Sequence, residues 1–106
     1  MSSVSNTRRV KSIKVNDLGT VLDKVNLIDI REAFEYRTGH LPGAKNIPME
    51  DLLYEPEEFM NKDKEYHLIC RSGRRSLMAC NELVKKGYKV TNVAEGTMAY
   101  KGELER

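Results

Sequence analysis

Short apolar runs alternate with helical patterns along this chain, and that alternation is the strongest restriction on its fold. Residues 25–30, 66–69 and 88–93 are rich in β-branched and apolar side chains, as expected of buried strands, and residues 12–15 and 44–47 are shorter runs of the same kind. Strands that alternate with helices form a mostly parallel sheet with helices on both faces. We therefore predict an α/β fold with a central sheet of about five short strands.

The segments between these runs carry helix signals. Asn16 is expected to cap a first helix, and Ser76 is expected to cap a later helix that ends at Gly87. Short helices are also expected at residues 34–36, within 49–61 with a break at a proline, and at 97–100. The apolar face predicted for the helix after Ser76 consists of Leu77, Cys80, Leu83 and Val84.

The chain has 106 residues, which is enough for one small core. We predict an N-terminal flexible arm over residues 1–10, which are polar, and a single domain over 11–106. The net charge is only +2, without tryptophan or a basic stripe, and this argues against a nucleic-acid partner. The sequence shows no signal peptide and no membrane span, so we expect a cytoplasmic protein without membrane contact. It leaves the oligomeric state open.

The two cysteines, Cys70 and Cys80, form no CxxC pair and have no histidine-rich partner set. This argues against a zinc site and a disulfide scaffold, so we expect reduced thiols, no metal and no cofactor. Cys80 falls on the predicted apolar helix face and is interpreted as structural.

The segment CRSGRRS, residues 70–76, places one thiol in a basic turn between a strand and a helix. Backbone N–H groups at a helix N-terminus and nearby arginines favour a thiolate, so Cys70 is the candidate nucleophile. Gly73 permits backbone angles that let successive N–H groups point at an anion, and serine hydroxyls could add donors. The candidate anion-binding residues are Arg71, Ser72, Gly73, Arg74, Arg75 and Ser76, and Arg75 is the arginine that we expect to turn toward the loop.

The segments LIDIRE (27–32), EY (35–36), GHLPGA (39–44) and NIP (46–48) resemble the first signature of rhodanese-like domains. Residues 70–76 resemble the active-site loop of that family, and the similarity covers about residues 11–102 in the right order. The sequence departs from the family pattern at Thr97, where a glycine is usual, and at Tyr100, where a tryptophan is usual. These departures concern support of the loop and choice of partner more than the chemistry.

The resemblance implies a rhodanese-like fold and a thiosulfate-type sulfurtransferase. In this reading Cys70 takes a sulfane sulfur from an anionic donor such as thiosulfate, holds it as a persulfide, and passes it to a thiol, a dithiol protein or cyanide. Asp29, Arg31, Glu35 and His40 are interpreted as structural support for the loops rather than as catalytic groups. His67, within a predicted strand, is also interpreted as structural.

Three alternatives remain open. The domain could be a persulfide relay or adaptor for a specific protein partner, with little activity toward free thiosulfate. A non-catalytic interaction module would have no need of Cys70 in a complete loop. Phosphatases and arsenate reductases on the same sheet use Cys-x5-Arg, whereas the spacing here is Cys70-x4-Arg75 and Ser76 stands where their arginine would be. The smaller loop favours a sulfur atom over a phosphate.

Overall fold

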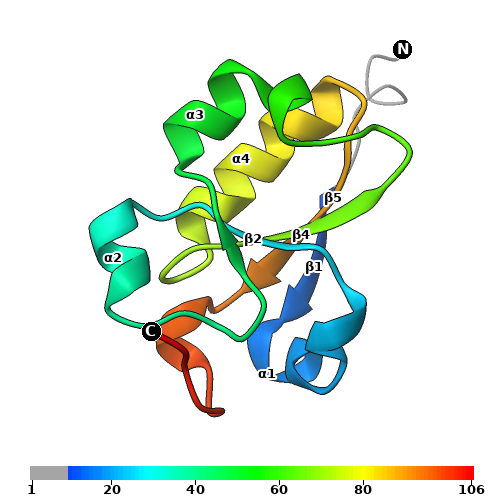
Figure 1. Cartoon of the computed structure of the whole chain (residues 1–106). Helices are drawn as coiled ribbons and strands as arrows, with labels where there is room; N and C mark the ends of the chain where they lie inside the picture. Colours follow the sequence, from blue (N-terminus) through cyan, green and yellow to red (C-terminus); the bar gives the residue numbers. More distant parts are fainter. Residues whose placement is uncertain (1–9) are drawn as a thin grey trace.

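A computed structural model describes residues 10–106, and its centre is a sheet of five parallel strands (Figure 1). The strands lie in the order β1-β5-β4-β2-β3, so β1 and β3 are the two edge strands. This confirms the predicted α/β fold. The strand bounds are β1 Lys11–Lys14, β2 Leu27–Asp29, β3 Lys45–Asn46, β4 Glu65–Ile69 and β5 Lys89–Ala94.

Most of the helical elements are one or two turns long. The exception is α4, with 12 residues, which directly follows the Cys70 loop. The predicted break at Pro56 separates α3 from a 3₁₀ turn, η3. The bounds are α1 Val15–Leu18, η2 Gly19–Lys24, α2 Ala33–Arg37, α3 Met49–Tyr54, η3 Pro56–Glu58, α4 Arg74–Lys85 and η4 Thr97–Ala99.

The core lies on both faces of the sheet. Figure 1 shows α3 and α4 on one side of the strands and α1 on the other. Alternate residues of one strand serve the two sides: Leu68 packs with α4, whereas Ile69 packs with α1 and the segment after it. Because both faces of the sheet are covered, residues 27–29 of β2 and 68–69 of β4 are buried at consecutive positions and not at every second one.

The first helix does not begin as predicted. Its N-cap is Lys14, not Asn16, and regular helix ends after one turn, with Val21 at φ −128° inside the 3₁₀ segment that follows. The side chain of Asn16 instead donates to the carbonyl of Ala99 and accepts from the N–H of Lys101. Both partners are more than eighty positions away in the sequence. The side chain of Asn16 therefore ties the C-terminal segment to α1.

The cap predicted for α4 was wrong, and the predicted face was correct at Cys80, Leu83 and the partly buried Val84 but not at Leu77. Gly73 is the N-cap, and Ser76 lies inside the first turn with its side chain buried. The buried face is Ser76, Ala79, Cys80 and Leu83, while Leu77 is 41% exposed. Ser76 is the first buried residue of this face, and its hydroxyl lies beside Cys70. The pattern of apolar residues could not reveal this position because Ser76 is polar. Gly87, at φ +94°, follows the helix end as expected.

The predicted arm, apart from Val10, lies outside the described residues. Within residues 10–106, no helix combines the length and the apolar character needed to cross a membrane.

Candidate active site

Cys70 follows β4 at the carboxyl end of the sheet, where ligand sites of parallel sheets form. Its side chain is fully buried. The Sγ atom accepts hydrogen bonds from the backbone N–H of Gly73 at 3.1 Å and of Ser76 at 3.3 Å. The hydroxyl of Ser76 lies 3.4 Å from the same sulfur. The loop therefore forms a cradle of donors around one sulfur atom.

Gly73 makes this cradle possible by its backbone conformation. It lies at φ +94°, which favours glycine, and a Cβ atom there would lie 3.0 Å from the backbone nitrogen of Glu95. The turn aims its N–H at Sγ and begins α4 at Arg74. The sequence correctly indicated glycine-dependent geometry at this position.

The environment lowers the pKa of the Cys70 thiol. Burial by itself raises that pKa, but hydrogen bonds from the side chain of Ser76 and from the N–H groups of Ser76, Gly73 and Ser72 outweigh it. The sequence indicated both backbone N–H groups and nearby arginines as causes of a lowered pKa, and in the structure the lowering comes from hydrogen bonds. A lowered pKa increases the fraction of the thiol that is present as the nucleophilic thiolate near neutral pH.

A second residue behind the cradle, Asn92, was missed by sequence reasoning. It lies on β5 and is 4% exposed, and its Oδ1 accepts a 2.5 Å hydrogen bond from the Ser76 hydroxyl. The register places it beside Leu68 of β4, two residues before Cys70. A polar residue between Val90 and Val93 in an apolar run was the only available signal, because buried amides require partners.

The segment that follows β5 supports the Cys70 loop through backbone hydrogen bonds. The N–H of Thr97 donates to the carbonyl of Cys70 at 2.9 Å, and the N–H of Met98 donates to the carbonyl of Arg71 at 3.0 Å. This close approach requires Gly96, because a Cβ there would lie 2.3 Å from the Arg71 oxygen. Thr97, a departure from the family pattern, adds a hydroxyl bond to the Cys70 carbonyl at 3.2 Å. Loop support is therefore present with threonine at this position.

The Arg75 guanidinium is bound by Glu35 of α2. Its Nη1 and Nη2 each lie 2.9 Å from one carboxylate oxygen, a bidentate ion pair. These hydrogen bonds hold the pKa of Glu35 at about 2. Arg75 was expected to turn toward the loop with its charge available to an anion, but its fork is engaged by this carboxylate. Its charge still interacts with Cys70.

The other loop residues that the sequence singled out lie at the surface. Arg71, Ser72 and Arg74 are exposed. Their positions allow contact with a molecule that approaches the loop, but they do not touch the sulfur with their side chains in this structure. Of the six residues predicted around Cys70, Gly73 and Ser76 donate hydrogen bonds to its sulfur, and the N–H of Ser72 also lowers the pKa of the thiol.

The predicted supporting residues form contacts with neighbouring loops. Arg31 donates to both oxygens of the buried Asp29 at 2.8–3.1 Å, and its Nη2 also donates to the Gly39 carbonyl at 2.7 Å. The His40 ring stacks on Tyr36, with 3.7 Å between ring centroids. His67 is half-buried in β4, and burial lowers its pKa.

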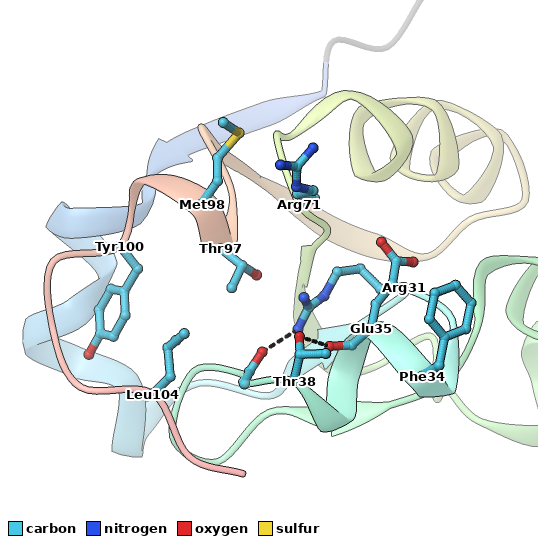
Figure 2. A pocket seen from close by; sticks show the side chains of 10 residues that line it. Arg31, Phe34, Glu35, Thr38, Arg71, Thr97, Met98, Tyr100 and Leu104 are labelled. Atoms are coloured by element: carbon cyan, nitrogen blue, oxygen red, sulfur yellow. Dashed lines mark hydrogen bonds between the residues drawn. The ribbon is translucent and has the colours of Figure 1, made fainter.

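A surface pocket of about 400 Å³ opens beside the loop (Figure 2). Figure 2 shows that its walls come from α2, from Arg71 of the loop and from the C-terminal segment. Apolar side chains are exposed around it: Phe34 and Met98 are each 63% exposed and Leu104 is 39% exposed. The pocket thus combines an apolar rim with a cation next to Cys70. Among residues 10–106 there is no cluster of three or more His, Cys, Asp or Glu side chains suited to a metal ion.

A buried thiol with a lowered pKa, held by N–H donors at the end of a parallel strand, is a candidate site for thiol-dependent group transfer. Comparison with known proteins identifies the class more closely. Residues 14–103 match the model of the rhodanese-like domain. The chain is 46% identical over 83 residues to the protein of Bacillus subtilis named "Putative sulfurtransferase YtwF", covering 78% of this chain and 80% of YtwF. The chain therefore belongs to the rhodanese-like family, and it is a sulfurtransferase in that broad sense.

Two further comparisons agree. "Putative sulfur carrier protein YrkF" of Bacillus subtilis is 38% identical over 84 residues, which are 78% of this chain but only 45% of YrkF. The crystal structure of a rhodanese-like domain protein from Staphylococcus aureus superposes with a TM-score of 0.78 at 31% identity, covering 91% of this chain and 97% of the other. The predicted rhodanese-like fold is confirmed.

Proposed function

We propose that the protein transfers sulfane sulfur through a persulfide on Cys70. In the first step the Cys70 thiolate attacks the outer sulfur of a donor such as thiosulfate. A Cys70 S–S bond forms, the donor's S–S bond breaks, and its electron pair leaves with sulfite. In the second step a thiolate or cyanide attacks the outer persulfide sulfur and restores the Cys70 thiolate. Charge and atoms balance in both steps without a metal or cofactor.

The observation that carries the proposal is the cradle itself. Sγ is fully buried and accepts two backbone N–H bonds, and the pKa of its thiol is lowered. Such donors stabilise negative charge on sulfur in the thiolate and in the persulfide anion alike. The broader class, sulfur transfer between a donor and an acceptor, follows from the family.

A relay between proteins is the second candidate, and the Arg75–Glu35 pair favours it. Free anions such as thiosulfate are best bound by unpaired cations, but the guanidinium of Arg75, whose charge interacts with Cys70, is already paired with a bidentate carboxylate. The exposed apolar rim beside the loop suits contact with another protein surface. The likeness to YrkF, whose name describes a sulfur carrier, agrees with this candidate.

Intact mass spectrometry tests the proposal. The purified protein is incubated with thiosulfate, or with a persulfidated protein, beside the Cys70→Ser variant. A persulfide adds about 32 Da that a dithiol reductant removes. A gain from thiosulfate that requires Cys70 supports the enzyme, and a gain only from the protein donor supports the relay. No gain from either donor would overturn sulfur transfer through Cys70.

A further inference from the structure

We propose that Asn92 is a positioning residue that holds the Ser76 hydroxyl and thereby sets the hydrogen bonding of the Cys70 sulfur. This inference rests on the proposed role of Cys70 as the reacting atom. It concerns a residue on β5 that does not touch the sulfur and acts through Ser76.

The proton count at Ser76 is the first step. A serine hydroxyl has one hydrogen to donate. Two acceptors flank the Ser76 oxygen: Asn92 Oδ1 at 2.5 Å and Cys70 Sγ at 3.4 Å. While Cys70 is a neutral thiol, the Ser76 hydroxyl donates to the amide oxygen of Asn92, its nearer acceptor, and presents its lone pairs to the sulfur. In this arrangement the Cys70 thiol can donate a hydrogen bond to the Ser76 oxygen, and the Ser76 hydroxyl donates one to Asn92. The hydroxyl lowers the pKa of Cys70 only when it turns to donate to the thiolate.

The thiolate needs the opposite arrangement. An anionic sulfur requires donors, and it then has the N–H groups of Gly73 and Ser76 but gains the Ser76 hydroxyl only if that hydroxyl turns away from Asn92. Asn92 is 4% exposed, so the amide oxygen left behind would have little access to replacement water. Asn92 therefore competes with the sulfur for one proton and restrains thiolate formation. This restraint is useful because nucleophilicity falls as a thiol becomes more acidic.

The charged and titratable groups around the sulfur are separate from the Asn92–Ser76 hydrogen bond. Arg75 and Cys80 interact electrostatically with Cys70, and Glu35 fixes Arg75. Arg71 and Arg74 lie at the loop surface. None of them contacts Asn92 through a hydrogen bond among the described residues, so an Asn92 variant isolates the hydroxyl effect.

The test measures the pH dependence of alkylation of Cys70 by iodoacetamide, in a Cys80→Ala background that leaves one thiol. Asn92→Ala removes the acceptor and commits the hydroxyl to the sulfur, and we expect the apparent pKa to fall by about one unit. At pH values below the apparent pKa, this shift makes the thiolate fraction about tenfold larger. Asn92→Asp keeps an acceptor and adds charge, and it should move the pKa upward.

Removing the hydroxyl is the control. In a Ser76→Ala background, Asn92→Ala should shift the alkylation pKa by much less than it does beside the native serine, because the path through the hydroxyl is gone. A merely structural Asn92 would leave the profile in place and lower only the stability. An equal shift with and without the hydroxyl, or a rise with Asn92→Ala, would overturn the inference.

The outcome is independent of the sulfur donor. Alkylation requires only a reactive thiol, so a failure of the proposed sulfur transfer appears in the mass experiment with an unchanged alkylation result. If Asn92→Ala does not fold, the Asn92→Asp profile decides the matter, since the absence of an upward shift would contradict the inference.

Discussion

Cys70 and Cys80 are equally buried, belong to the same core cluster and carry the same chemical group, yet their environments oppose each other. Around Cys70 the donors outweigh burial and lower the pKa. Around Cys80 burial prevails, with the charge of Cys70 adding to it, and the pKa rises to about 12. The comparison teaches that burial alone does not make a thiol inert or reactive. The presence of N–H and O–H donors decides.

The largest effect is expected when each of the two cysteines is replaced in turn. Cys70→Ser should remove sulfur uptake altogether, because an alcohol at this position has no accessible anion. Cys80→Ala should retain most uptake, since that thiol stays protonated. The measurement is the initial rate of persulfide formation. Equal loss in both variants would contradict a mechanism that uses one thiol.

The second test breaks the cradle without touching either cysteine. Gly96→Ala places a Cβ 2.3 Å from the carbonyl oxygen of Arg71, so the loop must move. We expect nearly complete loss of uptake and a destabilisation larger than the cost of about 1–3 kcal/mol for a strained backbone alone. Gly43→Ala is the control, because Gly43 also has positive φ but nothing lies within 4 Å of its Cβ position. Denaturant unfolding and uptake rates are measured together, and similar losses in both variants would argue against the clash.

The third test uses pH to separate the thiols. The folded pKa of Cys80 is raised, so its contribution to stability is present below the unfolded pKa and is lost as pH rises toward about 12. The free energy of unfolding of the wild type should therefore fall by about 1–2 kcal/mol between pH 7 and pH 10 through Cys80, and Cys80→Ala should not show this decrease. Cys70, with a lowered pKa, should contribute in the opposite sense, so its stabilisation is lost as pH falls through its folded pKa. Unfolding free energies from pH 7 to 10 provide the measurement, and parallel curves for wild type and Cys80→Ala would contradict the raised pKa.

The smallest expected effect concerns the ion pair beside Cys70. Glu35→Gln leaves the shape of the side chain but frees the positive charge of Arg75, and thiosulfate should then be used about two- to fivefold better at low concentration. Arg75→Ala should weaken the use of anionic donors more than that of a neutral organic trisulfide. Glu103→Gln removes an equal charge from an exposed position and serves as the control. An unchanged rate in Glu35→Gln would show that the pair does not govern donor choice.

Much of the fold and the centre of the site could be predicted from the sequence because they depend on local patterns. Apolar runs revealed all five strands, and the turn containing Gly73 marked Cys70 as the candidate nucleophile, whose pKa the structure lowers. The aspartate and arginine at residues 29 and 31 are close in sequence, so their ion pair was also predictable.

The missed contacts depend on residues that are distant in sequence. The Glu35–Arg75 pair joins α2 to α4 across 40 positions, and the Asn92–Ser76 bond requires the register between β4 and β5. Neither follows from a local pattern. The start of α4 was misplaced for a related reason: Ser76 was read as a helix cap, whereas its hydroxyl is turned inward by the partner on β5.

The cradle around Cys70 is made mainly of main-chain groups, and this has a consequence for how the domain can diverge. Replacing Arg71, Ser72 or Arg74 alters the surface that an incoming molecule meets but leaves every backbone donor and the supporting turn in place. The reactive centre and the recognition surface can therefore change independently. A designer could redirect the domain to a new partner by substitutions on the outside of the loop while inheriting its sulfur chemistry unaltered.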